Sequence, residues 1–198
     1  MNYFTFPYRS CEYLKLRELQ IDFQHCRAVV LGDGGDKIGV TSVQDLAAVV
    51  AAAVEFEGVW PRIGGVRGEL ITIAELIALG EKIRGLISSL FPFLWCGTAD
   101  FVIGKKFEVA RLSVEDVEKG ELKTEWIPSF TSLSCEELAR STSDEYKREN
   151  LARVLLAGNL LATRRGAWAV SDEWNRLLPE FKMTGVEEFL PEHWKGKP

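Results

Sequence analysis

Hydroxyl and amine side chains that exchange protons with a carbonyl group are the first candidates for chemistry. Tyr3 and Tyr8 could present hydroxyl groups to a carbonyl substrate. No Tyr-x-x-x-Lys pair occurs, and Tyr146 and Lys147 are adjacent, so their side chains would point apart on a helix. The tyrosines therefore do not predict a catalytic pair.

Histidine and cysteine, the usual metal ligands and nucleophiles, are sparse. His25 lies in a polar stretch before a strand candidate and His193 lies in a proline-containing tail, so we expect both rings to be solvated. The four cysteines, which form no Cys-x-x-Cys pair and have no histidine at ligand spacing, are Cys11, Cys26, Cys96 and Cys135. The sequence therefore assigns no catalytic residue and no metal ligand.

Two glycine-rich stretches resemble phosphate-binding turns. Gly64-Gly65-x-x-Gly68 lacks the βαβ context that a dinucleotide-binding turn requires, and no Gly-x-x-Gly-x-x-Gly occurs. Residues 32–36 include Asp33 and Asp36, which would repel an anion. We therefore predict a turn and strand start at the first stretch and a β-hairpin turn at the second, and we assign no cofactor-binding residue.

The composition is that of an acidic globular protein. The chain has 198 residues, of which 46% are hydrophobic and 27% charged, with a net charge of −5 and a pI near 5.3. We expect a single domain over residues 1–198. An acidic chain without a clustered Lys/Arg stripe repels phosphate backbones, so we expect no nucleic-acid partner. No basic segment followed by an apolar stretch opens the chain, so a cytoplasmic location is expected.

Helix start and stop signals and short apolar runs alternate along the chain. The predicted helices span residues 42–55, 72–84, 113–120, 134–140, 145–164 and 184–190, the last ending before Pro191. The predicted strands span residues 27–31, 37–40, 69–71 and 107–112. This alternation predicts an α/β fold in which helices pack on a small, partly parallel sheet.

The helix predicted over residues 42–55 is apolar on nearly every side. Leu46, Val49, Val50 and Val54 fall at helical spacing, and alanines fill most other positions. Because no polar residue interrupts the stripe, we expect these four side chains to be buried, with the helix packed on the sheet.

Four stretches, through their order and spacing, resemble a known family. They are residues 28–34 leading to residues 41–47, Gly64-Gly65-x-x-Gly68-x-x-Ile71-Thr72-Ile73-x-Glu75-Leu76, Lys106-Phe107-Glu108-Val109 before a capped helix, and Val186-Glu187-Glu188-Phe189-Leu190. They resemble the C-terminal half of the NmrA-like and isoflavone-reductase-like family of atypical short-chain dehydrogenases. The resemblance implies an incomplete Rossmann-like sheet of C-terminal strands with a mostly helical substrate-binding lobe, and a missing N-terminal dinucleotide-binding half.

The same resemblance carries expectations about function. The family uses NADP(H), and its members include reductases of small phenolic or polyketide-like compounds. Tyr3, Phe6, Pro7 and Tyr8 resemble the pocket wall beside the nicotinamide end of the cofactor. The family's glycine fingerprint and catalytic lysine have no counterpart here, so we expect weak or absent NADP(H) binding and no turnover by this chain. The alternative is a non-catalytic NAD(P)-sensing or regulatory protein, as some relatives are.

Residues 86–103 depart from the family pattern and form a predicted insertion. Their uncharged part is shorter than the ~20 residues that a membrane-spanning helix needs, and it contains Pro92 and Gly97. A retained intron is the preferred interpretation, with an interfacial segment or an apolar lid as alternatives. We expect few contacts with the lobe, and an apolar patch that would require a protein partner.

Overall fold

The structure is a computed structural model that describes residues 1–8, 10–14, 17–88, 105–129, 145–195 and 197. The helix predicted over residues 134–140 and residues 89–103 of the predicted insertion lie outside the described residues. The insertion hypothesis and its protein partner therefore stay predictions.

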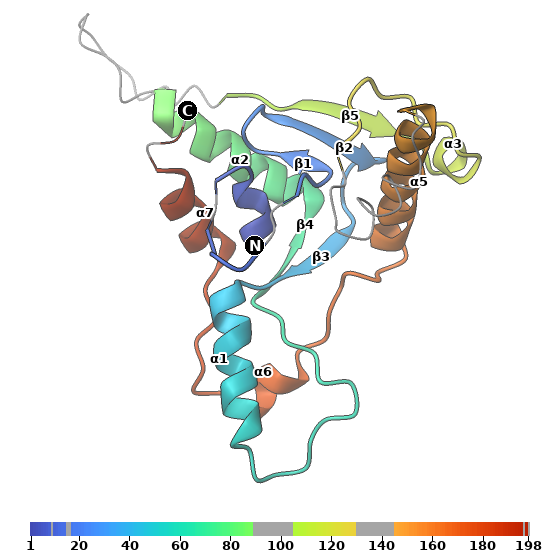
Figure 1. Ribbon diagram of the computed structural model, residues 1–198. Coiled ribbons are helices and arrows are strands. Elements are labelled where there is room, and N and C mark those ends of the chain that lie inside the picture. The colour runs from blue at the N-terminus through green and yellow to red at the C-terminus, as the bar shows by residue number, and fades with distance from the viewer. Residues whose placement is uncertain (9, 15–16, 89–104, 130–144, 196, 198) are drawn as a thin grey trace, which may run out of the picture.

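The fold is mixed α/β with two small sheets (Figure 1). In the first sheet, β2 (Arg27–Leu31) pairs antiparallel with β1 (Ile21–Asp22) and parallel with β5 (Glu108–Leu112). In the second, β3 (Lys37–Val40) pairs antiparallel with β4 (Glu69–Thr72). The α/β prediction is confirmed, and each predicted strand is present to within one residue.

The prediction of a hairpin at residues 32–36 is wrong. Strands β2 and β3 belong to different sheets, because both edges of β2 are already paired, with β1 and with β5. The glycine-rich stretch does turn, with Gly34 N donating to Leu31 O at 3.0 Å and Gly34 at a φ of +82°. The turn residues predicted a reversal of the chain correctly, but they carry no information about which strand pairs with which.

The helices begin close to the predicted capping residues. They are η1 (Asn2–Thr5, a 3-10 helix), α1 (Val43–Val54), α2 (Ile73–Ser88), α3 (Val114–Glu118), α5 (Glu145–Arg164), α6 (Glu173–Leu177) and α7 (Val186–Trp194). Thr72 and Glu75 cap α2 reciprocally, with Glu75 N donating to Thr72 Oγ1 and Thr72 N donating to Glu75 Oε2. None of the helices in the described ranges has an apolar stretch long enough to cross a membrane.

Helix α7 runs through Pro191, so the prediction that it ends before this proline is wrong. Proline removes one helical hydrogen bond, but tertiary packing of the last turn compensates for the loss. Trp194, in that turn, is fully buried, and its indole Nε1 donates to Phe4 O at 3.1 Å.

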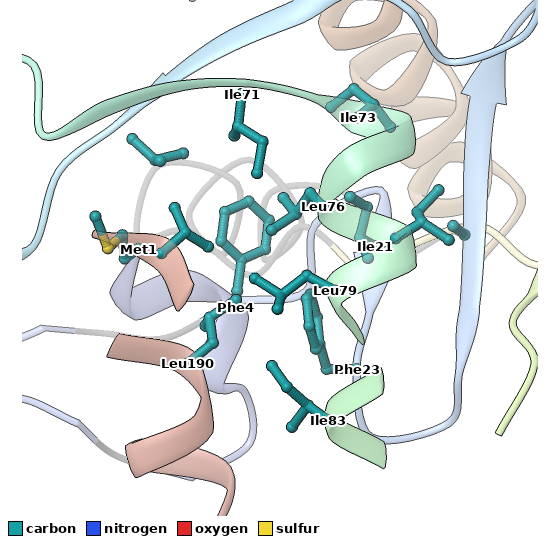
Figure 2. Close-up of a cluster of buried hydrophobic side chains, with 14 of the residues drawn as sticks. Met1, Phe4, Ile21, Phe23, Ile71, Ile73, Leu76, Leu79, Ile83 and Leu190 are labelled. Atoms are coloured by element: carbon teal, nitrogen blue, oxygen red, sulfur yellow. The ribbon is translucent and has the colours of Figure 1, made fainter. Parts of the chain in front are cut away.

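The three-stranded sheet separates two hydrophobic clusters. Side chains alternate along β2, so that Ala28 and Val30 join the cluster around α2, whereas Val29 and Leu31 join the cluster around α5. The first cluster also takes side chains from η1 and α7, and Figure 2 shows them converging between these elements. The helices α2 and α5 therefore cover opposite faces of this sheet.

The burial predicted for α1 is largely wrong. Val49 is buried, but Leu46, Val50 and Val54 are 44%, 54% and 75% exposed. The helix extends away from the sheets beside α6 (Figure 1), where Val49 packs in a small cluster with Trp174. A short partner element covers only a narrow strip of α1, so a continuous apolar stripe does not guarantee continuous burial.

The Asp22 carboxylate holds the turn between β1 and β2. One oxygen accepts hydrogen bonds from the amides of Gln24 and His25, and the other lies 2.7 Å from His25 Nδ1 and 2.9 Å from Arg27 Nε. Burial acts to raise the pKa of Asp22, but hydrogen bonds from the His25 ring and amide and from Arg27 outweigh it and lower the pKa below 3.8.

We predict that Asp22→Asn lowers the free energy of unfolding at pH 7 by roughly 1.5–3 kcal/mol, because it removes charge-assisted hydrogen bonds at a buried site. The folded-state pKa lies below the unfolded one, so the advantage of the wild type is present above the unfolded pKa and is lost as pH falls through the folded pKa. Urea unfolding over a pH series measures this, with the exposed Glu57→Gln as the charge-removal control. A difference that persists undiminished near pH 2 would contradict the prediction.

Candidate functional site

A cavity of about 320 Å³ lies where η1, β1 and β3 meet α5 and the segment that follows it. Its lining combines aliphatic side chains from the strands with aromatic side chains from η1 and from residue 168. Its lining residues are Met1, Tyr3, Phe4, Arg17, Leu19, Gln20, Ile21, Ile38, Gly39, Val40, Thr41, Ile73, Asn159, Thr163, Trp168 and Val170. A small, mostly apolar cavity with a few polar groups is the usual form of a small-molecule site.

One wall of the cavity depends on a close backbone approach at Gly39. Gly39 N donates to Trp168 O at 2.6 Å, which brings residues 168–170 alongside β3. A Cβ atom on Gly39 would lie 3.1 Å from Trp168 O and 3.2 Å from Val170 N. A side chain at this strand position would push residues 168–170 away from β3. Glycine is therefore required here because the two backbone segments approach closely, and not because of its φ.

Several polar groups of the cavity are satisfied internally. Thr163 Oγ1 donates to Asn159 O at 2.8 Å, and Thr41 Oγ1 accepts from Gly68 N and donates to Val66 O. Asn159 Nδ2 donates to Gln20 Oε1 at 2.7 Å, which ties α5 to the chain just before β1. Among the described residues, this pair leaves the Gln20 amide nitrogen and the Asn159 amide oxygen without partners, so these atoms can serve a ligand.

The cavity also contains a cation. Arg17 is half-buried, and its Nε atom is buried without a hydrogen-bond partner. Its guanidinium carbon lies 5.2 Å from the centroid of the Tyr3 ring, within the range of a cation–π contact.

The structure separates the four residues predicted as a pocket wall. Tyr3 lines the 320 Å³ cavity, whereas Tyr8 lines another pocket of about 260 Å³ beside His193 in α7. Phe6 and Pro7 line neither of these two. The full set of four stays a prediction, and Tyr3 is its member at the candidate site.

Sequence reasoning missed the polar residues of the cavity. Asn159 and Thr163 stand four residues apart in the mostly apolar C-terminal half of α5, a spacing that puts both on one helical face. That signal was available in the sequence. Arg17 and Gln20 carry no such signal, because they lie in an irregular segment that long-range packing brings to the cavity.

A second, larger hollow of about 670 Å³ lies beside β2 and β5. Arg27 lines it but is paired with Asp22 and stacked 4.4 Å above the Trp126 ring. Lys123 also lines it and is paired with Asp116 at 2.9 Å. Because these cations already have carboxylate partners, the smaller and mostly apolar cavity is the better candidate site.

The N-terminus of α2, the natural place for an anion beside a strand end, is closed by the protein itself. Ile73 N donates to Asp36 O at 3.0 Å, Ala74 N to Gly34 O at 2.9 Å, and Glu75 N to Thr72 Oγ1 at 3.1 Å. The three amides of the first turn, which have no partner within a helix, are therefore all in use.

The other glycine stretch is also occupied. Gly65 N donates to Glu173 Oε2 at 3.1 Å, and Gly65 O accepts from Trp174 N at 3.0 Å. Hydrogen bonds from Ser171 and from backbone amides, including that of Gly65, lower the pKa of Glu173. The stretch thus docks the segment around α6. Among the described residues, no group of three or more His, Cys, Asp or Glu side chains could hold a metal ion.

Two curated proteins, both named oxidoreductase swnN, are similar to the chain. The protein of Arthroderma benhamiae is 25% identical over 179 residues, which cover 89% of this chain and 53% of that protein. The protein of Metarhizium robertsii is 28% identical over 183 residues, which cover 89% of this chain and 44% of that protein. The chain therefore spans about half the length of the curated relatives it matches. No protein-family profile and no solved structure matches it.

We predict that Gly39→Val lowers the free energy of unfolding by about 1–3 kcal/mol, because the added side chain overlaps the backbone of residues 168–170. Gly158→Ala is the matched control. Gly158 lies in α5 with open space around it, so this change should stabilise the protein by about 0.5–1 kcal/mol. Urea unfolding measures both. A Gly39→Val protein as stable as the wild type would contradict the proposed contact.

Proposed function

We propose that this chain forms the substrate-binding part of an oxidoreductase-type protein and receives a small organic substrate in the 320 Å³ cavity. The two relatives named oxidoreductase support the class, because their similarity extends over 89% of the chain. The cavity, with its aromatic sides and its unpartnered Arg17 and amide groups, supports the role. The resemblance to NmrA-like reductases adds NADP(H) as the cofactor of the whole protein and a small phenolic or polyketide-like compound as its substrate.

The observation that supports a substrate-binding rather than a dinucleotide-binding role is the closed N-terminus of α2. A dinucleotide-binding turn offers free amides to a pyrophosphate, whereas here Asp36 O, Gly34 O and Thr72 Oγ1 accept those hydrogen bonds. A phosphate at this position would have to displace the capping interactions and approach Asp33 and Asp36. This part of the chain is therefore suited to bind substrate and not the dinucleotide.

We expect no saturable binding of NADPH, with any dissociation constant weaker than about 1 mM, because several charge-assisted hydrogen bonds of roughly 1.5–3 kcal/mol each are unavailable. Isothermal titration calorimetry of the purified chain tests this directly. Saturable binding of NADPH in the micromolar range would overturn the proposal that this chain binds substrate and not the dinucleotide.

The cavity itself is tested with 2-naphthol, a neutral aromatic probe. We expect saturable binding to the wild type and its loss in Val170→Trp, in which the larger side chain fills the cavity from its rim. Val59→Trp makes the same substitution at a site that is 92% exposed and outside the cavity, so it should leave binding unchanged. Equal binding of 2-naphthol to both variants would contradict the assignment of this cavity.

A further inference from the structure

Arg17 is an arginine without a charge partner at the edge of an apolar cavity. Its Nε atom is buried and unbonded, and among the described residues its guanidinium makes no ion pair. Leaving a buried donor unsatisfied costs stability, so such an arrangement persists most readily where a ligand completes it. The guanidinium packs against the Tyr3 ring, with its carbon 5.2 Å from the ring centroid.

The two acidic residues that follow Arg17 in sequence, Glu18 and Asp22, are engaged with other partners. Glu18, its neighbour in sequence, accepts hydrogen bonds from Ser129 N and Oγ at 2.7 and 2.9 Å and also lies 3.9 Å from Arg27. Asp22 is fully engaged in the β1–β2 turn. No aspartate or glutamate occurs among the described residues that line the cavity. The positive charge of Arg17 is therefore not neutralised by the protein at this site.

The rest of the cavity matches a flat, apolar body. The Tyr3, Phe4 and Trp168 rings line it together with aliphatic side chains from the strands. The remaining polar groups, on Gln20 and Asn159, are neutral amides at the α5 side. A ligand that satisfies all of these surfaces has one anionic end, an aromatic or otherwise planar body, and room for one neutral hydrogen-bonding group.

We propose that the substrate of this cavity is a small aromatic carboxylate whose carboxylate pairs with Arg17. This inference rests on the proposed function of the cavity as the substrate site and adds the chemical class of its ligand. A guanidinium matches the two oxygens of a carboxylate, with two parallel N–H donors, and one such pair neutralises Arg17, which is the only Lys or Arg side chain among the described residues that line the cavity. A pyrophosphate, in contrast, carries more charge than this site can balance.

The test compares 2-naphthoate with 2-naphthol, which share the ring system and differ in the anionic group. Titration calorimetry near pH 7.5 should show that the wild type binds 2-naphthoate roughly tenfold to a hundredfold more tightly than 2-naphthol. In Arg17→Met this preference should disappear while the affinity for 2-naphthol is retained. Arg17→Lys should keep part of the preference, because it preserves the charge and loses the planar fork.

Two controls separate binding from folding and from net charge. Arg62→Met removes the same charge from an exposed position in the segment between α1 and β4, so it should bind both probes as the wild type does. The melting temperature of ligand-free Arg17→Met should be unchanged or higher, because the lost Nε has no protein partner. Marked destabilisation of this variant would show that Arg17 is structural and would overturn the inference.

The outcomes also separate the inference from the function on which it rests. Saturable binding of 2-naphthol without a preference for 2-naphthoate, or a preference that survives Arg17→Met, overturns the carboxylate assignment and leaves the cavity as a substrate site. Failure of the wild type to bind either probe overturns both.

Discussion

The closure of the α2 N-terminus by residues 34 and 36 is the interaction on which the rest of the structure depends. By accepting hydrogen bonds from Ala74 and Ile73, the turn after β2 is fixed to the start of α2, and β3 then leaves the turn to pair with β4 instead of β2. The chain is thereby divided between two sheets that share one helix. The same hydrogen bonds use the amides that an anion would need, so a single local arrangement decides both the topology and the chemistry that the site can offer.

A second set of long-range contacts holds the C-terminal part of the chain against this framework. The Asp45 carboxylate accepts from Thr184 N at 2.9 Å, and Glu69 Oε2 accepts from Val186 N at 2.8 Å. Both acids lie at the positive N-terminal end of α7, where the helix dipole favours them. With that end fixed, the last turn of α7 places Trp194 in the core, where its indole donates to Phe4 O in η1. Tyr3, in the same 3-10 helix, lines the cavity. The packing of α7 therefore positions one side of the candidate site from a distance.

Local features of the fold were predictable, whereas their partners were not. The capping pair Thr72 and Glu75 and the bounds of the strands follow from residue types within a few positions, and the structure contains them. The partner of β2, the exposure of Val50 and the passage of α7 through Pro191 depend on segments far away in sequence. Hydrophobic periodicity and turn-forming residues describe one helix, strand or turn at a time. They therefore do not predict how much of a helix face a neighbouring element buries.

The candidate site could not be predicted from local sequence features either. Its walls come from residues 1–41, 73 and 159–170, so no motif of contiguous residues could identify it. What distinguishes the site is an electrostatic imbalance. Each of the cations Arg27, Lys123 and Arg164 has a carboxylate partner within 3 Å, whereas Arg17 and Arg84 make no ion pair among the described residues and pack against the Tyr3 and Trp194 rings. Of these two arginines, Arg17 is the one that lines the candidate cavity. An unbalanced charge that is fixed in an apolar cavity binds an ion of opposite charge without the cost of reorganising the protein, and it discriminates against neutral analogues of the same shape. Under the proposed assignment, ligand selection would follow from the missing salt bridge of Arg17, and the surrounding contacts would set the position of that side chain.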